Sequence, residues 1–290
     1  MTISFRLGLR RFLTTLFICW TAGVTVEAAD KVAGSLTVKD ALTLPNQAVR
    51  IEAQLTGTTH SGGQAVGGVS LQLRIDGKPV ATAKTNDGGQ AFFDYRPKMR
   101  GTHAVSVTVD DPSPVEAGKA EATLFVWERR RPILLVEVAA LMQTDGSTSS
   151  PGSTASTGKG LGPSAQPAAG AAEELSRLTQ YYYNLVYLPG GDQSPTEVAS
   201  VEVIRRWLAS NRFPSGLVLM PVSGGLSAAL DAFKQDGWTA MKTGIGRTRS
   251  FAELLLQHRM DVVVVPELPK GELPRKAKAA KDWKEVRKKL

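Results

Sequence analysis

Cysteine is almost absent from this sequence. The single one, Cys19, lies in an apolar stretch near the N-terminus. Disulfide bonds within the chain, cysteine–zinc sites and thiol catalysis are therefore excluded. Histidine is nearly as scarce, and His60 and His103 are scattered through the first half of the chain. We interpret both as surface or strand residues, and the sequence predicts neither a metal site nor a cofactor.

Long apolar runs are also missing, except at the N-terminus. Three arginines precede the apolar segment Phe12–Val26, and small side chains near Ala28 offer a cleavage point. This pattern is typical of a secretory signal, here residues 1–28, and the apolar run is short for a membrane span. The alternative is an uncleaved membrane anchor. We expect an exported protein of a bacterial periplasm or cell surface.

The body of the chain lacks net charge, although the whole sequence carries a formal charge of +8. Residues 1–28 contain three arginines and one glutamate, and residues 270–290 contain nine Lys/Arg and three Asp/Glu. Residues 29–269 are therefore neutral. Because residues 29–269 are neutral, we do not expect them to bind nucleic acid. Any anionic partner is expected to contact the basic C-terminal segment.

Short alternating segments separated by turn residues fill the first part of the chain. They predict about seven strands: Ser35–Lys39, Ala48–Leu55, Val69–Ile75, Val80–Lys84, Gln90–Tyr95, His103–Val109 and Ala120–Trp127. Asp76-Gly77 is a typical hairpin turn, whereas the Gly/Ser/Thr-rich residues 56–68 predict a mobile loop. One apolar and one polar face per strand indicate a two-sheet sandwich over residues 31–129.

The turns and aromatic residues of this region occur in a recognisable order. The run is Gly77-Lys78-Pro79-Val80, Thr85-Asn86-Asp87-Gly88, Phe92, Tyr95, Pro97 and Gly101-Thr102-His103. It resembles bacterial immunoglobulin-like modules. The resemblance implies an immunoglobulin-like sandwich, and it says little about function because such modules mostly serve as spacers or adhesive units.

Strands and helices alternate from residue 130 onward. The expected strands are Ile133–Val138, Asn184–Leu188, Leu217–Val222 and Asp261–Val265. The expected helices are Ala171–Tyr181, one beginning at Ser194-Pro195-Thr196-Glu197, Leu226–Gln235, and one opening with the capping box Ser250-Phe251-Ala252-Glu253. This order predicts a parallel sheet with helices on both faces. Residues 143–170, rich in Ser, Thr, Gly, Ala and Pro, predict a flexible loop.

Three segments of this second half recur together in a known family. They are Asn184-Leu185-Val186-Tyr187-Leu188-Pro189-Gly190-Gly191, Arg206-Trp207-Leu208 and Phe213-Pro214-Ser215-Gly216. On these segments, residues 130–268 resemble the haloacid dehalogenase (HAD) superfamily, and most closely its lipin-type phosphatidate-phosphatase-like branch. The resemblance implies a three-layer α/β domain with a Rossmannoid parallel sheet.

The resemblance also implies which residues ought to carry phosphatase chemistry. The family uses Asp-x-Asp-x-Thr after the first strand: the first aspartate attacks phosphorus and binds Mg²⁺, and the second is the acid and base. The corresponding family positions are occupied here by Glu137, Ala139 and Leu141, by Pro189, and by Glu267. Loss of the acid/base alone typically costs ~10²–10⁴ in rate. We therefore expect a pseudoenzyme in which Glu137 and Lys242 are vestigial.

Two interpretations of the surviving polar residues stay open. Glu137 either retains a catalytic role or, as we favour, is paired with a helix N-terminus or with Lys242, because a buried acid needs a partner. The segment Lys242–Arg249 predicts either a weak anion site, formed by Lys242, Gly244, Gly246 and Arg247, or a capped loop with solvated cations. No serine–histidine–acid arrangement is evident in the sequence.

The C-terminal residues 269–290 combine a basic surface with an apolar stripe. Ala279, Trp283, Val286 and Leu290 lie at helical spacing from Arg275 onward, between seven Lys/Arg side chains. The helix is predicted either to dock on its own domain or to contact an anionic envelope component such as lipid head groups. A protein partner is not predictable from the sequence.

The sequence is compatible with three functions. The leading one is an exported, non-catalytic HAD-like binding or scaffolding protein of the cell envelope. The second is a divergent phosphohydrolase that acts on a phosphate ester with Glu137 and Lys242, although the acids are too few for Mg²⁺. The third is an envelope protein whose basic tail binds an anionic polymer or lipid.

Overall fold

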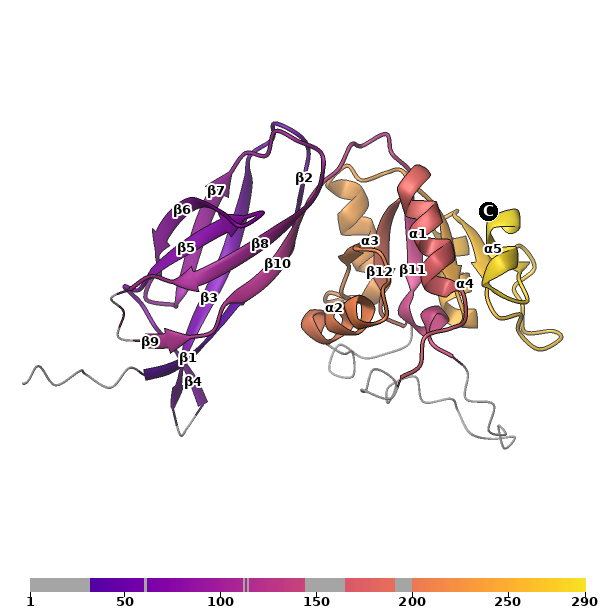
Figure 1. Cartoon of the computed structure of the whole chain (residues 1–290). Coiled ribbons are helices and arrows are strands. Elements are labelled where there is room, and N and C mark those ends of the chain that lie inside the picture. Colours follow the sequence, from indigo (N-terminus) through magenta and orange to yellow (C-terminus); the bar gives the residue numbers. More distant parts are fainter. Residues whose placement is uncertain (1–31, 60–61, 112, 114, 144–164, 191–199) are drawn as a thin grey trace, which may run out of the picture.

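The computed structural model describes residues 32–59, 62–111, 113, 115–143, 165–190 and 200–290. The predicted signal, most of the loop 143–170 and the predicted helix start at Ser194 lie outside these residues. The described chain forms two parts, a β-sandwich followed by a parallel sheet covered by helices (Figure 1). None of the helices in the described part is long and apolar enough to cross a membrane.

Two five-stranded sheets form the sandwich. The first contains β1 (Val32–Val38), β3 (Val49–Thr59), β4 (Gly62–Ala65), β7 (Gln90–Tyr95) and β9 (Val115–Ala117). The second has the order β2-β10-β8-β5-β6, with β2 (Ala41–Thr43), β5 (Ser70–Ile75), β6 (Lys78–Lys84), β8 (Gly101–Val109) and β10 (Ala120–Val126). All predicted strands are present, so the immunoglobulin-like sandwich is the fold of this part.

Alternation in the sequence determines which side chains fill the sandwich. Leu71, Leu73 and Ile75 of β5 are buried against Val105 and Val107 of β8, and their polar neighbours face solvent. Burial of each such side chain contributes about 1.5–3 kcal/mol to folding. The Asp76-Gly77 turn joins β5 to β6 with φ of 50° and 76°, the left-handed pair that this turn requires.

The prediction of a mobile loop at residues 56–68 was wrong. Strand β3 continues to Thr59, and β4 pairs with it antiparallel from Thr56↔Ala65 to Thr59↔Gly62. Glycine and threonine hid this hairpin because neither supplies the apolar alternation by which strands are recognised. Strands β2 and β9 were also missed, because each is only three residues long and so short a run shows little alternation.

A six-stranded sheet with every strand parallel forms the second part. Its order is β13-β12-β11-β14-β15-β16. The strands are β11 (Ile133–Glu137), β12 (Asn184–Leu188), β13 (Leu217–Val218), β14 (Met241–Gly246), β15 (Asp261–Val264) and β16 (Lys278–Ala279). All five residues of β11 are buried, as expected of a central strand that is covered on both faces.

Helices cover both faces of this sheet (Figure 1). On one face, α1 (Ala171–Tyr181), α2 (Val201–Ser210) and α5 (Trp283–Lys289) share a core with alternate strand residues. On the other face lie α3 (Gly225–Gln235) and α4 (Arg249–Gln257). Helix α1 and strand β12 have the predicted bounds, whereas β13 keeps two of the six residues expected for it.

Strand β14 corrects the prediction for the segment Lys242–Arg249, which was interpreted as a turn. Residues 241–246 form a central strand between β11 and β15, with Ile245 opposite Val136 and Val263. Helix α4 then starts with Thr248 as N-cap, whose Oγ1 accepts the N–H of Phe251 at 3.2 Å. The predicted capping box at Ser250 does not form, because Glu253 instead pairs with Arg249 at 2.7 Å.

The C-terminal segment is an integral part of the sheet rather than a separate tail. Residues 278–279 add the strand β16, and α5 is shorter than the predicted helix. Trp283 and Val286 are buried in the same core as α1, and the indole N–H of Trp283 donates to Ala140 O at 3.2 Å. The predicted docking of Trp283 and Val286 on their own domain is therefore confirmed.

Side chains at the end of β10 join the two parts. Phe125 and Trp127 belong to the core beneath α3, where Trp127 meets Trp238 edge-on with ring centroids 6.0 Å apart. Arg129 stacks on the same Trp238 ring and donates to Asp236 O at 2.9 Å. The sandwich therefore packs against the parallel sheet through an aromatic core to which both parts contribute.

Candidate functional site

The parallel sheet has one topological switch point, between β11 and β14, among its described strands. From β11 the chain continues to β12 on one side, and from β14 to β15 on the other. In open α/β sheets the crevice beyond the carboxyl ends of such strands is the usual ligand site. Glu137 ends β11, and Arg247 and Thr248 follow β14. These residues are therefore the first candidates for a site.

The Glu137 carboxylate is bonded entirely within the protein. Its Oε2 accepts the backbone N–H groups of Arg247 and Thr248 at 2.6 and 2.9 Å. Its Oε1 accepts the Thr248 hydroxyl at 2.6 Å. The first N–H groups of a helix attract anions, and here the anion is a side chain of the chain itself. Of the two partners predicted for Glu137, the structure shows the helix N-terminus and not Lys242.

Burial controls the acidity of this carboxyl group. Glu137 has no exposed surface, and its burial raises the pKa above the usual range. The hydrogen bonds from Thr248 and from the two backbone N–H groups oppose this rise, because they stabilise the charged form. The Arg247 side chain donates to Met142 O at 2.9 Å beside the 3-10 turn Val138–Leu141. The arrangement seals the end of β11 rather than exposing a nucleophile.

Gly244 and Gly246 allow close packing and do not cradle an anion. A Cβ atom on Gly244 would lie 2.1 Å from Leu255 Cδ1, and one on Gly246 would lie 2.2 Å from Phe251 Cδ1. Both glycines lie in the ladders of β14 with β11 and β15. They allow α4 to approach the sheet, so the predicted anion site built on their backbone is not present in the form expected.

Lys242 lies at the opposite end of the strand from Glu137. It is exposed and follows Met241, which pairs with Ile133, whereas Glu137 lies four residues farther along β11. Lys242 lies in the bulge between the pairs Ile133↔Met241 and Leu134↔Thr243, three to four residues from the level of Glu137. At about 3.3 Å per residue this is a separation of about 10–13 Å along the sheet. The structure therefore does not bring together the two vestigial residues.

The other family positions do not supply the missing groups. Ala139 and Leu141 are buried in the 3-10 turn, Pro189 is buried after β12, and Glu267 is exposed. Within the described ranges, no group of three or more His, Cys, Asp or Glu side chains could hold a metal ion. His103 is bonded to Asp76 Oδ2 at 2.8 Å and to Met99 O at 3.2 Å, which is a structural arrangement.

A serine, a histidine and an acid do meet elsewhere, on the α3/α4 face. His258 Nε2 lies 2.8 Å from Ser227 Oγ, and its Nδ1 lies 3.4 Å from Asp231 Oδ1 and 3.0 Å from Lys234 Nζ. No local pattern predicted this cluster, because Ser227 and His258 are 31 positions apart in the chain. A lysine only donates, so Nδ1 accepts and Nε2–H donates to Ser227. The cluster therefore does not activate Ser227 as a nucleophile.

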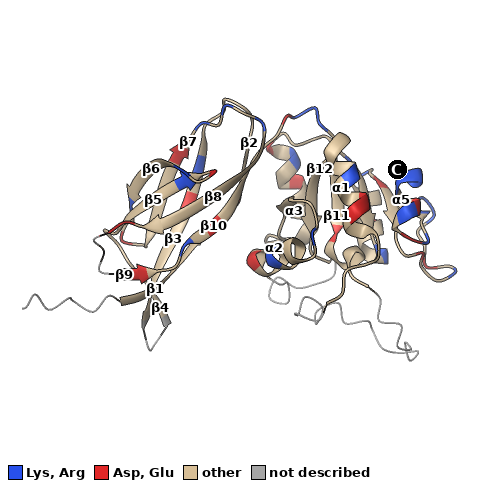
Figure 2. Cartoon of the chain, viewed as in Figure 1, with Lys and Arg blue, Asp and Glu red and all other residues tan. Residues whose placement is uncertain are grey.

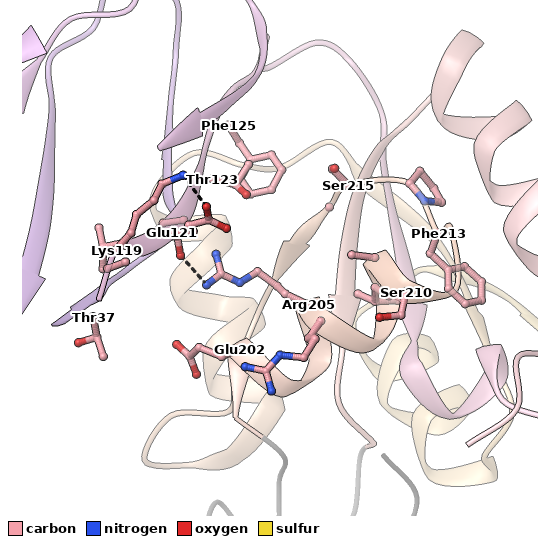
Figure 3. A pocket seen from close by; sticks show the side chains of 18 of the residues that line it. Thr37, Lys119, Glu121, Thr123, Phe125, Glu202, Arg205, Ser210, Phe213 and Ser215 are labelled. Atoms are coloured by element: carbon pink, nitrogen blue, oxygen red, sulfur yellow. Dashed lines mark hydrogen bonds and ion pairs between the residues drawn. The ribbon is translucent and has the colours of Figure 1, made fainter. Parts of the chain in front are cut away.

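A hollow of about 680 Å³ lies between the two parts of the molecule. Figure 3 shows Arg205 of α2 reaching across it toward β10. Its guanidinium bonds to Asp40 Oδ1 at 2.5 Å and to Glu121 O at 3.1 Å. Asp40 Oδ1 also accepts the N–H of Thr123 at 2.7 Å. Burial raises the pKa of Asp40, and the Arg205 charge opposes that rise.

A second hollow of about 330 Å³ lies nearer the linker, and it shares Ser215 with the first. Residues of β10 and its end line one wall of each hollow. The opposite wall comes from α2 and the Phe213–Gly216 turn in the larger hollow, and from the end of α1 and the start of β12 in the smaller. We call these two adjoining hollows the interdomain seam.

Basic residues are concentrated in the C-terminal segment, where Figure 2 colours much of the ribbon around α5 blue. The exposed ones are Arg275, Lys276, Lys278, Lys281, Lys284, Arg287, Lys288 and Lys289. They surround the buried Trp283 and Val286, so the charges stay in solvent while the apolar stripe is used for folding. We call this surface the C-terminal basic face.

The comparisons with known proteins show similarity of fold only. No protein-family model matches the sequence, and neither does any curated protein. Fibronectin(III)-like modules of Clostridium thermocellum CbhA are 13% identical over 33% of this chain and 47% of theirs, with a TM-score of 0.25. The chain therefore spans about half the length of those modules.

Two further solved structures give similar values. The CARDB domain of a Pyrococcus furiosus protein is 18% identical over 33% of this chain and 96% of its own, with a TM-score of 0.26. The D0–D1 domain of intimin is 14% identical over 36% of this chain and 57% of its own, with a TM-score of 0.26. The assignment of an immunoglobulin-like sandwich rests on the sheet topology described above.

Proposed function

We propose that the chain is an exported, non-catalytic binding or scaffolding protein of the cell envelope. In this proposal, an immunoglobulin-like module precedes a HAD-like α/β domain whose catalytic position has become structural. The observation that carries it is the Glu137 carboxylate, which is buried and bonded to the N–H groups of Arg247 and Thr248 directly before α4 and to the Thr248 hydroxyl. A carboxylate held in this way neither attacks phosphorus nor leaves room for a phosphoryl group.

The HAD-like part of the proposal has support from topology. A central β11 that ends in an acid, followed by a tight turn, is the arrangement that the resemblance implies. Strand order alone is shared by many α/β folds and carries no function. The departures at Ala139, Leu141 and Pro189 concern the chemistry and leave the architecture intact.

The first experiment tests for catalysis. Purified mature protein is assayed with p-nitrophenyl phosphate and with a phosphatidate emulsion, in Mg²⁺ and in EDTA. We expect no Mg²⁺-dependent turnover above that of a Glu137→Ala variant. Turnover that is lost in Glu137→Ala but kept in Glu267→Ala would establish the divergent phosphohydrolase instead. The separation of Lys242 from Glu137 already removes the support for that alternative.

The partner that we propose is an anionic lipid surface, contacted by the C-terminal basic face. Exposed cations near a membrane attract anionic head groups, and the attraction is screened within ~10 Å at 0.1 M salt. Because Trp283 and Val286 are buried, no apolar stripe remains for insertion, and charge alone has to supply the contact. Binding should therefore fall steeply between low and physiological salt.

The second experiment compares charge variants in co-sedimentation with phosphatidylglycerol vesicles. A truncation would remove core residues of the sheet, so charges are neutralised instead in Lys281→Gln/Lys284→Gln/Lys288→Gln. The matched control is Lys78→Gln/Lys84→Gln/Lys98→Gln on the sandwich, where these lysines are exposed too. We expect low-salt binding to weaken in the first triple variant only. Equal binding by both, or none by the wild type, would contradict this partner.

A further inference from the structure

Two adjacent tyrosines are the most exposed large apolar side chains described in the α/β domain. Tyr181 ends α1 and Tyr182 follows it, and they are 68% and 61% exposed. Their ring centroids are 6.2 Å apart, and neither hydroxyl group makes a hydrogen bond within the described ranges. Rings so exposed contribute little to folding. A ring with an apolar face and a polar end suits a boundary between water and an apolar phase.

The linker between the two parts of the molecule is basic and adjoins these tyrosines. Pro132 O accepts the N–H of Asn184 at 2.8 Å, two residues beyond Tyr182. The Arg131 side chain donates to Thr179 O in the last turn of α1. These two contacts hold the linker against the end of α1, and Figure 2 shows the blue linker segment at this end of the domain.

Paired acids do not cancel the charge of the linker. Arg130 is exposed, and its side chain makes no hydrogen bond or ion pair in the part of the chain that the structure describes. Arg129 and Arg131 donate to backbone carbonyl oxygens, which leaves their charge in place. Glu128 is already paired with Arg100 at 3.2 Å. The linker therefore keeps a positive charge beside the two tyrosines.

The arginines and tyrosines together form a surface that is both cationic and aromatic. We call it the linker-end patch, and its residues are Arg129, Arg130, Arg131, Tyr181 and Tyr182. Asp236, whose carbonyl oxygen accepts Arg129, is an exposed acid beside it, so three arginines outweigh one carboxylate there. An anionic bilayer complements both features. Its phosphate groups attract the arginines, and tyrosine rings are favoured at the boundary between head groups and acyl chains.

The linker-end patch lies on the same side of the sheet as the C-terminal basic face. Helices α1 and α5 pack together in one core (Figure 1). Both begin beyond the carboxyl end of β11. There the N–H of Ala168, just before α1, donates to Leu141 O, and the Trp283 indole of α5 donates to Ala140 O. Because the two helices are neighbours on one side of the sheet, a single bilayer can meet both surfaces.

We infer that the linker-end patch places its tyrosine rings in the head-group region of an anionic bilayer. This inference deepens the proposed lipid contact and rests on it for the bilayer as partner. The C-terminal basic face offers charge without an exposed apolar group, so its binding is screened as salt rises. The tyrosines add an apolar contribution that salt does not screen. A fraction of the binding should therefore persist at physiological salt.

Fluorescence quenching by brominated lipid tests whether the tyrosines enter the bilayer. All tryptophans that follow the predicted signal are buried, so an indole added at the surface can be followed separately. Tyr182→Trp places it in the patch. Phe92→Trp is the matched control, because Phe92 is 44% exposed beside Arg50, and the charge of Arg50 is paired with Asp94 at 3.0 Å. Vesicles of phosphatidylglycerol brominated on the acyl chains should quench the added fluorescence of Tyr182→Trp only.

Substitutions in the mature full chain then separate the apolar from the charged contribution. Tyr181→Ser/Tyr182→Ser should weaken vesicle binding at physiological salt by at least about threefold, because the apolar contribution is lost. Arg130→Gln should weaken binding at low salt by about fivefold, the usual effect of one basic side chain near an anionic surface. Phe92→Ser and Lys84→Gln, which change exposed residues of the sandwich, are the matched controls and should bind like the wild type.

The outcomes distinguish this inference from the proposed lipid contact. If Tyr182→Trp is not quenched while the C-terminal triple variant binds less, the inference is wrong and the proposed contact stands. If Tyr182→Trp is quenched while the C-terminal triple variant binds like the wild type, the inference stands and the contact belongs to the linker-end patch alone. Equal quenching of Tyr182→Trp and Phe92→Trp would overturn the inference. Absence of binding by the wild type would overturn both.

Discussion

The switch point and the interdomain seam differ in how their polar groups are satisfied. At the switch point, the Glu137 carboxylate accepts the Thr248 hydroxyl and the N–H groups of Arg247 and Thr248. At the seam, the Asn184 amide and the Arg206 guanidinium lack partners among the described residues. The usual ligand position of the fold is thus closed by the chain's own carboxylate, while unsatisfied groups gather where two domains meet. The topology indicates where a ligand site can form. Whether that position is available to a ligand depends on whether its polar groups are already hydrogen-bonded within the chain.

The largest expected effect comes from opening the closed site. Glu137→Ala leaves two buried N–H groups without a partner and creates a cavity, so the free energy of unfolding should fall by about 3 kcal/mol. Glu137→Gln, which keeps one acceptor oxygen, should lose less. The measurement is urea denaturation followed by tryptophan fluorescence. Glu267→Ala, an exposed glutamate, is the control, and a similar loss there would contradict the structural role of Glu137.

The next effect tests the ion pair that spans the seam. Arg205→Ala leaves the Asp40 carboxylate buried without its cation, and the free energy of unfolding should fall by about 2–3 kcal/mol at pH 7. Burial already raises the pKa of Asp40, and removal of Arg205 raises it further. The folded variant then binds a proton more readily than the unfolded chain, so its deficit should shrink as pH falls toward 4.

The neighbouring Arg206→Ala is the matched control for this experiment, because it removes a cation without a partner in the described structure. It should change the unfolding free energy by less than about 0.5 kcal/mol. Equal losses in the two variants, or a deficit in Arg205→Ala that does not depend on pH, would contradict the importance of the Asp40 pair.

A smaller effect tests why β14 is rich in glycine. In Gly246→Ala the added Cβ would lie 2.2 Å from Phe251 Cδ1, against a fully buried ring. Overpacking of this kind costs about 1–3 kcal/mol. Gly118→Ala is the control, because nothing lies within 4 Å of its added Cβ. Thermal unfolding of both variants measures the difference, and equal melting temperatures would show that α4 does not need this glycine.

The smallest effect concerns the cluster on the α3/α4 face. Burial and the charge of Lys234 lower the pKa of His258. The unfolded chain then binds the proton more readily than the folded one, so this contribution to stability is present above pH 6.5 and is lost as pH falls below it. In His258→Gln, the melting temperature should vary less between pH 7 and 5 than in the wild type. An identical pH dependence would contradict the lowered pKa.

The sandwich was the more predictable half because its signals are local. Alternating side chains and the Asp76-Gly77 turn identified every strand of the sandwich that is longer than four residues. In the parallel half, β11, β12 and α1 were recognisable from apolar runs and helical spacing. Strand β14 was missed because Met241–Gly246 contains two glycines and a lysine, which are typical of a loop. Its strand character comes from pairing with β11 and β15, which are distant in sequence.

The candidate site was only partly predictable for a related reason. Glu137 lies among apolar residues, so the sequence predicted that its carboxylate needs a partner. A helix N-terminus was one of the partners expected. Thr248 was not foreseen, because helix α4 starts two residues earlier than the capping box at Ser250 indicated. The seam and the Ser227–His258 contact join residues from separate elements, so no local pattern announces them.

Amide chemical-shift mapping tests the central claim most directly. Isotope-labelled mature protein is titrated with phosphate in the presence of Mg²⁺. Phosphate should leave the backbone amides of Arg247 and Thr248 unmoved, because the Glu137 carboxylate occupies them. Saturable phosphate shifts at Arg247 and Thr248 would contradict the structural role of Glu137.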